Sequence, residues 1–381
     1  MDYAATTPVD PKVLEEMKPY FSKRFGNASS LHSMGQEAKK AMEYSRSKAA
    51  DLINAELREI IFTSGGTEAN NFALKGVAYA NRDKGNHIIT SAIEHHAILD
   101  PLKWLEKNGF DVTILPVDKY GLVRPEQVAD AITPKTTLVS IMAANNEIGT
   151  IEPIKEIGEI CKDHDVYFHT DAVQAVGKIP IDVERMNIDL LSMSAHKIYG
   201  PKGVGYLYVR NGVKIDPLLH GGGQEFGLRS TTENVAGIVG FGKAIELRKR
   251  EMYKEAERLK VLNDRMIKDI LKIESSYLNG HPIKRLYNNA NFHFDFIEGE
   301  SLILRLDAKG IEASTGSACS STSLEPSHVL LAIGLRHEQA HGSLRLTIGK
   351  WTKRSDVNYV TKVLPEVVEK LREISPFKKS W

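Results

Sequence analysis

Short apolar runs alternate with longer amphipathic segments over roughly residues 45–245 of the 381-residue chain. Helical spacing of apolar residues predicts helices over Thr67–Arg82, Pro153–His164 and Asn234–Lys254. The predicted strands are Glu59–Thr63, His87–Ser91, Asp111–Leu115, Thr137–Met142, Val166–Thr170, Ile188–Ser194 and Gly205–Val209. Alternation of this kind predicts an α/β fold with a mainly parallel seven-stranded sheet and helices on both faces.

The pattern changes near residue 245. Residues Ala244–Glu274 are highly charged and carry a sparse apolar stripe, which predicts one long helix linking two domains. A mixture of short strands and helices follows and predicts a smaller α+β domain: Asn291–Phe296, Ser343–Thr347, Glu300–Lys309 and Asp356–Ile374. We therefore expect a large domain over residues 15–250, and a small domain built from residues 1–14 and 251–381.

The composition excludes several classes of protein. Lys and Arg number 50 and Asp and Glu 49, a net charge of +1, whereas a general nucleic-acid binder carries a clustered basic excess. Two cysteines are too few for a disulfide framework and form no Cys-x-x-Cys zinc pair, which favours a reducing, cytoplasmic setting. We see no apolar run that could span a membrane and no secretory signal, and expect neither membrane nor nucleic acid as a partner.

Residues Ser64–Glu68 read Ser-Gly-Gly-Thr-Glu, between a predicted strand and a predicted helix. Glycines let the backbone approach an anion, and a helix start offers unpaired N–H groups and a positive dipole end. The segment has the form of a phosphate cradle, although it lacks the Lys-Ser/Thr of a P-loop and the third glycine of a dinucleotide fingerprint. Taken alone, it can equally be an ordinary turn in which Thr67 caps the helix and Asn70 is a helix residue.

Two further segments follow predicted strands, at the edge where open α/β sheets bind ligands. Asp171 ends one strand, where a carboxylate could hold a protonated ring nitrogen or simply cap a helix. Lys197 follows another strand in Ser-Ala-His-Lys-Ile-Tyr-Gly-Pro, where it could form a Schiff base or be a solvated loop charge. Ser194 and His196, beside it, could bind phosphate oxygens.

The combination of these segments narrows the alternatives. A phosphate cradle, an acid for a ring nitrogen and a Schiff-base lysine occur in that chain order, all at carboxyl ends of predicted strands. The chain between Asp171 and Lys197 is long enough for one crossover and one further strand. Pyridoxal 5'-phosphate (PLP) requires this set of groups, and the sequence therefore predicts a PLP site.

The two cysteines stand in different surroundings. Cys319 lies in Thr-Gly-Ser-Ala-Cys-Ser-Ser-Thr-Ser, a small and polar stretch that predicts an exposed loop. We interpret Cys319 as a reactive thiol that can reach different sites. Cys161 shares an apolar helical stripe with Ile157 and Ile160, and we interpret it as inert packing.

Arg345 and His95 complete the candidate residues. Arg345 alternates with apolar residues in Ser-Leu-Arg-Leu-Thr, where it could grip a carboxylate with two hydrogen bonds or form a surface salt bridge. His95 follows the strand ending at Ser91 and could stack on a cofactor ring or act as an acid/base. His95 and His96 also suggest a metal, but no further ligand lies at useful spacing, so we expect no resident metal.

With these residues in view, the sequence resembles the cysteine desulfurases of iron–sulfur cluster assembly. They are the NifS/IscS-like branch of the class-V aminotransferase group of fold-type I PLP enzymes. The resemblance covers essentially the whole chain and is carried by motifs in the same order: DYAATTPVDP, SGGTEANN, EHHAILD, NNEIGT, HTDAVQAVGK, SAHKIYGPKG, GGGQE, LRSTTEN, TGSACSSTSLEPSHVL and SLRLTIGKWT. It implies the fold of a fold-type I PLP-dependent transferase.

The resemblance implies roles for particular residues. Lys197 would form the Schiff base with PLP and later move protons, Asp171 would pair with the pyridinium nitrogen, and His95 would stack on the ring and serve in acid/base steps. Arg345 would bind the substrate carboxylate and Cys319 would take the sulfur. The other implied contacts are Gly66, Thr67, Ser194 and His196 at the phosphate, Gln174 and Asn146 on the ring O3′ side, Asn146 also near the substrate carboxylate, and Thr232 at the phosphate of a neighbouring subunit.

The implied reaction removes sulfur from L-cysteine and leaves L-alanine and a persulfide on Cys319. The role of Thr232 implies a homodimer. The uninterrupted SACSSTSLEPSHV stretch resembles the branch whose members hand sulfur to an IscU-type scaffold for iron–sulfur cluster assembly. Such a loop would also allow Cys319 to be a transient iron–sulfur ligand shared with that scaffold.

Other functions stay open on the sequence alone. A selenocysteine lyase shares most of these motifs, and a related aminotransferase would not need Cys319. A catalytically idle assembly platform would require neither Lys197 nor Cys319. A nucleotide-binding protein that used Ser-Gly-Gly-Thr-Glu as a phosphate loop would leave Asp171, Lys197 and Cys319 without roles.

Overall fold

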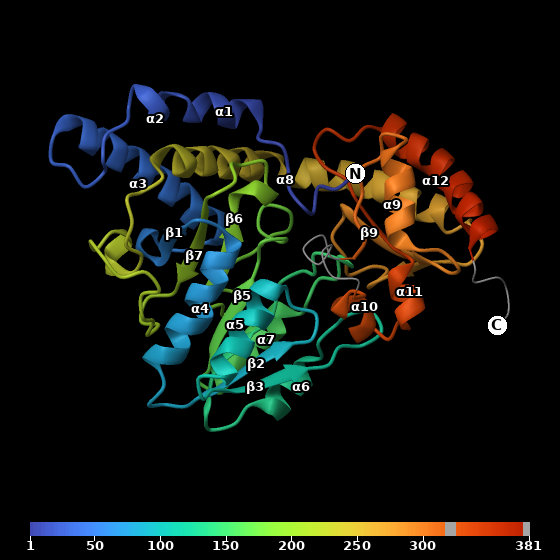
Figure 1. The fold of residues 1–381 in the computed structure, drawn as a ribbon. Coiled ribbons are helices and arrows are strands. Elements are labelled where there is room, and N and C mark those ends of the chain that lie inside the picture. Colours follow the sequence, from blue (N-terminus) through green and yellow to red (C-terminus); the bar gives the residue numbers. More distant parts are fainter. Residues whose placement is uncertain (317–324, 376–381) are drawn as a thin grey trace.

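The structure, a computed structural model, describes residues 1–316 and 325–375. Figure 1 shows two groups of strands, each covered by helices, with one long helix running past both. None of the helices in the described ranges has an apolar stretch long enough to cross a membrane.

Seven strands form the larger sheet, in the order β1-β7-β6-β5-β4-β2-β3. Neighbouring strands are parallel except where β7 pairs antiparallel with β1 and β6. The strands are β1 (Ile60–Thr63), β2 (His87–Ser91), β3 (Asp111–Leu115), β4 (Thr136–Ser140), β5 (Tyr167–Asp171), β6 (Leu190–Ser194) and β7 (Gly205–Val209). The predicted seven-stranded, mainly parallel sheet is confirmed, and each strand lies within two residues of its predicted ends.

Helices cover both faces of this sheet, as expected, because successive strand residues point to opposite sides and both sides are apolar. Ile88 and Leu138 belong to the core under α4 and α5. Their neighbours Ile89 and Val139 belong to the core on the other face, which also contains residues of α3, α7 and α8. The helices around the sheet are α3 (Ser33–Ile53), α4 (Gly66–Ala80), α5 (His96–Glu106), α6 (Pro125–Ala131), α7 (Ile154–Asp163) and α8 (Val235–Ile270), with the shorter α1 (Pro11–Met17) and α2 (Pro19–Ser22) at the N-terminal end.

The second sheet is antiparallel and has three strands in the order β10-β9-β8. Its core contains apolar residues of α9 and α12 and a bridge ties the N-terminal Asp2 to Thr347 of β10. The elements are β8 (Ser276–Asn279), β9 (Asn289–Phe294), β10 (Ser343–Thr347), α9 (Gly299–Asp307), α10 (His328–Ala332), α11 (His337–His341) and α12 (Arg354–Ile374). This mixture of strands and helices agrees with the predicted α+β character, while the domain boundaries at residues 14 and 250 stay a prediction.

Helix α8 joins the two cores. Its first half contributes Phe241 and Ile245 to the core of the large sheet, and its second half contributes Leu259 and Met266 to the core of the small one. The sequence pattern predicts two overlapping helices here, whereas the structure has one continuous helix of 36 residues. Because a single helix packs in both cores, it positions the small sheet relative to the large one.

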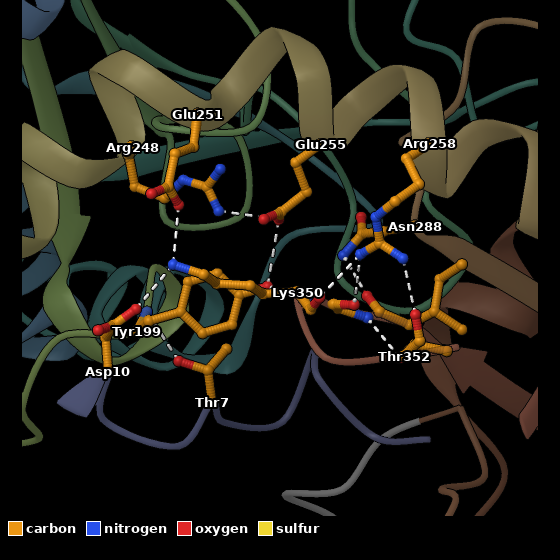
Figure 2. A network of polar contacts seen from close by, with 12 residues as sticks. Thr7, Asp10, Tyr199, Arg248, Glu251, Glu255, Arg258, Asn288, Lys350 and Thr352 are labelled. Carbon is orange, nitrogen blue, oxygen red and sulfur yellow. Dashed lines mark hydrogen bonds and ion pairs between the residues drawn. The ribbon is translucent and has the colours of Figure 1, made fainter. Parts of the chain in front are cut away.

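A polar network beside α8 ties these parts together, as Figure 2 shows. Lys350 Nζ donates to Asp10 Oδ2 at 2.7 Å and to Glu251 Oε2 at 2.8 Å. The hydroxyl of Tyr199 accepts from the backbone N–H of Lys350 at 2.7 Å and donates to Glu255 at 3.3 Å. The network therefore connects the N-terminal segment, the loop that follows Lys197 and the loop after β10 through one helix.

Candidate active site

One cavity of about 270 Å³ opens at the carboxyl ends of β5 and β6, beside the start of α4. Ten of the residues singled out in the sequence line it, so the fold brings together groups that are up to 279 positions apart. They are Gly66, Thr67, His95, Asn146, Asp171, Gln174, Ser194, His196, Lys197 and Arg345. This edge of an open α/β sheet is the one where the rule for such folds expects a ligand.

The glycine pair at the start of α4 forms one end of the cavity. Gly65 caps the helix with φ of +154°, a backbone conformation that side-chain-bearing residues rarely adopt, and the helix begins at Gly66. The alternative in which Thr67 caps the helix is therefore wrong. A Cβ on Gly65 would lie 3.7 Å from Ser194 Oγ, so the hydroxyl faces the turn. First-turn N–H groups and a hydroxyl at one point suit an oxyanion such as a phosphate.

Asp171 is the last residue of β5 and is buried at the cavity wall. Its Oδ2 accepts from Asn70 Nδ2 at 2.7 Å, and its Oδ1 accepts from the backbone N–H of Val173 at 3.0 Å. The second contact closes a turn, and none of the helices in the described part of the chain begins there, so the alternative of a helix cap is wrong. The carboxylate lines the cavity instead. Asn70, which the sequence indicates only as a helix residue, is thus a further residue of the site, and its partner lies 101 positions away in the chain.

Lys197 follows β6 and reaches the N-terminal segment. Its Nζ donates to the backbone carbonyl of Ala4 at 2.5 Å and to that of Ala5 at 2.8 Å. Gln174 Nε2 donates to the same Ala4 carbonyl at 3.0 Å. Since the lysine is half-buried in a cavity and engaged with main-chain carbonyls, the alternative of a solvated loop charge is wrong.

Two histidines at the cavity are held in their neutral forms. Burial lowers the pKa of His95. The charge of Lys197 lowers this pKa as well, whereas the charge of Asp171 raises it. His95 Nδ1 accepts from the backbone N–H of Ala97 at 3.0 Å, which leaves the ring proton on Nε2. Burial and the neighbouring lysines lower the pKa of His196 to about 4. Both rings can therefore act as neutral hydrogen-bond partners at neutral pH.

Arg345 lies on β10 of the small sheet and lines the cavity from that side. It is only 2% exposed, so the alternative of a surface salt bridge is wrong. Its Nη1 donates to the carbonyl of Asn146 at 3.1 Å and its Nη2 pairs with Asp2 at 3.0 Å. The guanidinium Nε is buried and has no hydrogen-bond partner among the described residues. A buried guanidinium with an unused N–H suits a carboxylate ligand.

Thr232 and Cys161 lie away from this cavity. Thr232 lines a different hollow, together with Thr63 and Arg229. Cys319 lies outside the described residues. Cys161 is buried in α7 without a disulfide, and burial raises the pKa of its thiol, in keeping with inert packing.

The chain is similar to one group of known proteins, both in sequence and in structure. The class-V aminotransferase family matches residues 1–360. A Methanosarcina thermophila protein named cysteine desulfurase IscS is 60% identical over 376 residues, which are 99% of this chain and 93% of that protein. A solved structure named NifS-like protein is 40% identical with a TM-score of 0.92, covering 97% of this chain and 99% of that one. Another, titled SspA in complex with cysteine, is 41% identical with a TM-score of 0.82, covering 91% and 97%.

Proposed function

Since this chain belongs to the class-V aminotransferase family and is a cysteine desulfurase, we propose that the cavity around Lys197 holds PLP and L-cysteine and that Cys319 takes the sulfur. The observation that carries this proposal is that four kinds of functional group line one cavity. These are a phosphate cradle at Gly66, a carboxylate at Asp171, an amine at Lys197 and a guanidinium at Arg345.

Class-V aminotransferases and cysteine desulfurases generally depend on PLP, and the residues present fit that group. The N–H groups of Gly66 and Thr67 would bind the phosphate, together with Ser194 and His196. Asp171, held by Asn70, would accept the ring N–H, and Gln174 and Asn146 would contact the O3′ side. When bound, the cofactor supplies an electron sink for the substrate's α-carbon.

Two protein groups would handle protons at the reacting atoms. Lys197 Nζ would hold the cofactor and, once released, carry a proton to or from the substrate. Its contacts with the Ala4 and Ala5 carbonyls give the free amine a defined resting place. His95, which lines the same cavity with its proton on Nε2, can donate that proton or stack against a ring.

Arg345 and Asn146 would bind the substrate carboxylate and so fix which end of L-cysteine faces the loop of Cys319. The Cys319 thiolate would then attack the substrate sulfur. A sulfur–sulfur bond forms, the carbon–sulfur bond breaks with its electron pair, and a proton completes the methyl group of L-alanine. The products are L-alanine and a persulfide on Cys319, without an external oxidant or reductant.

The assembly and the acceptor are further parts of the proposal. We expect a homodimer in the cytoplasm, in which Thr232 reaches the phosphate of the neighbouring subunit. This is consistent with its place in a separate hollow of its own chain. We expect the acceptor of the sulfur to be an IscU-type scaffold for iron–sulfur cluster assembly. Residues 15–250 would carry the cofactor, and residues 1–14 with 251–381 would carry Cys319.

The test is a single turnover with L-cysteine in the absence of reductant, followed by mass spectrometry of the peptides. We expect the mass of one added sulfur on the peptide that contains Cys319 and none on the peptide that contains Cys161. Cys161→Ala is the matched control and should form the same adduct. An adduct on Cys161, or L-alanine formed without any adduct, would contradict the assignment of Cys319.

A further inference from the structure

Lys178 is a buried lysine for which the proposed reaction gives no role. It lies in the turn after β5, and its residue is 8% exposed. Its Nζ donates to Gln174 Oε1 at 2.7 Å, which is the one hydrogen bond of this side chain within the described ranges. Lysine side chains are seldom buried unless a partner or a function requires the charge there, because burying a charge costs free energy. The burial of Lys178 therefore needs an explanation.

A chain of hydrogen bonds leads from Lys178 to Lys197. Lys178 donates to Oε1 of Gln174, whose Nε2 donates to the carbonyl of Ala4 at 3.0 Å. The second lone pair of that carbonyl accepts from Lys197 Nζ at 2.5 Å. Four groups from three separate stretches of the chain are thus joined in series, and the series ends on the amine that we propose holds the cofactor.

The ammonium fixes the orientation of the Gln174 amide. An ammonium can only donate hydrogen bonds, and a carbonyl oxygen can only accept them. If the amide turned over, its NH₂ would face the ammonium and its oxygen would face the Ala4 carbonyl. Both contacts would then be repulsive, so only the observed orientation is compatible with a charged Lys178.

The charges around Lys178 are mainly positive. Burial, together with the charges of Lys197, Arg248 and Arg345, lowers its pKa to about 7, although the charge of Glu255 acts in the opposite direction. Glu255 is itself paired with Arg248, Nη1 to Oε1 at 2.8 Å, as Figure 2 shows. Burying an amine among positive charges lowers the stability of the fold. Buried groups with strongly shifted pKa values are common at functional sites.

We propose that Lys178 is a positioning residue for the desulfuration reaction: it fixes the Gln174 amide and, through the Ala4 carbonyl, the resting place of the Lys197 amine. The inference rests on the proposed function, because it gives Lys178 a role toward the groups that would hold the cofactor. Lys178 does not line the cavity and touches neither cofactor nor substrate in this account.

The test compares the PLP-loaded enzyme with its Lys178→Met variant, which keeps a chain of similar length but has no donor. Lys155→Met on the exposed side of α7 is the matched control. The pH titration of the bound cofactor's absorbance reports on the surroundings of Lys197 and requires no turnover. Steady-state rates with L-cysteine give kcat and KM separately.

We expect Lys178→Met to shift the absorbance titration and to lower kcat about tenfold, with KM changed less than about twofold. In a Gln174→Ala background the same substitution should have almost no further effect, because the two residues act in series. Lys155→Met should match the wild type in every measurement. If Lys178→Met does not fold, Lys178→Leu, which also has no donor, is judged by the same criteria.

An absorbance titration and kcat equal to those of Lys155→Met would overturn the inference and make Lys178 a purely structural residue. Effects that add fully to those of Gln174→Ala would also overturn it, because they would show that Lys178 does not act through the amide. Failure of the proposed function looks different. In that case the wild type itself would bind no PLP through Lys197, or would release no L-alanine.

Discussion

Arg345 Nη2 lies 3.0 Å from Asp2 Oδ1, so the guanidinium proposed to bind the substrate carboxylate already faces a carboxylate of its own chain. The other oxygen of Asp2 accepts from Ser314 Oγ at 2.8 Å, and the backbone of Asp2 pairs with Thr347. The N-terminal segment therefore orients Arg345 and also balances part of its charge. The two effects can be separated by substitution.

Arg345→Ala should raise KM for L-cysteine by about tenfold or more, because it removes the charge-assisted hydrogen bonds to the substrate carboxylate. The affinity for PLP should change much less, since the proposed cofactor contacts lie on the large sheet and α4. Steady-state kinetics and a PLP titration of the apoprotein measure the two quantities. An equal loss of both would make the arginine structural.

Asp2→Asn should lower KM for L-cysteine. The amide oxygen keeps an acceptor for Arg345 Nη2, so the guanidinium stays in place, while the competing negative charge is gone. Asp51→Asn, on the exposed surface of α3, should leave KM unchanged. A KM raised as strongly as in Arg345→Ala would mean that Asp2 is needed to hold the arginine and does not compete for it.

Asn70→Ala should weaken PLP binding by about tenfold. It removes the side-chain hydrogen bond to Asp171 Oδ2, and hydrogen bonds to charged groups contribute about 1.5–3 kcal/mol. The side chain of the neighbouring Asn71 donates to the backbone carbonyl of Thr67 within its own helix, so Asn71→Ala is the matched control. Equilibrium titration of both apoproteins with PLP compares them. Equal affinities would remove Asn70 from the site.

The sequence could predict the large sheet because its strands are short apolar runs, and Asp171, Ser194 and Lys197 because they end or follow those runs. Asn146 and Gln174 are implied only by the family resemblance. Elements with weaker patterns were missed. Helix α5 contains Pro101, α6 has only seven residues, and β8 is a four-residue edge strand with one exposed side chain. In each case the packing against a neighbouring element, and not the local pattern, decides the structure.

The hydrogen bonds that orient the site residues could not be predicted from the sequence either. The bonds from Asn70 to Asp171 and from Arg345 to Asp2 join residues 101 and 343 positions apart. Only the Lys178–Gln174 pair is close enough in sequence to be noticed, and its significance depends on burial. The sequence thus identifies the groups that do chemistry more readily than the groups that orient them.

Glu94 makes stability depend on pH. Burial raises its pKa from the ordinary 4.5 to about 8, although Ser91 Oγ and the N–H of Met142 donate to one of its oxygens. The folded chain keeps this proton between those pH values and the unfolded chain does not. The unfolded chain therefore binds fewer protons, and stability falls as pH rises, by up to about 1.4 kcal/mol per pH unit.

Glu94→Gln should remove this contribution, because an amide does not titrate. Relative to the wild type, the variant should gain stability as pH rises from about 5 to about 8, with no further gain above that range. Urea unfolding of both proteins across these pH values measures the difference. The exposed Glu156→Gln should follow the wild-type slope, and a Glu94→Gln curve parallel to the wild type would show that Glu94 is ionised in the folded chain.

The proposed reaction requires both Lys197 and Cys319 to remove sulfur from L-cysteine. It is tested most directly by measuring L-alanine and sulfide from L-cysteine with PLP-loaded protein and a reductant, beside Lys197→Ala and Cys319→Ala. We expect equal amounts of the two products from the wild type and neither from the two variants, with Lys197→Ala still folded by circular dichroism. Normal sulfide release by Lys197→Ala would contradict it.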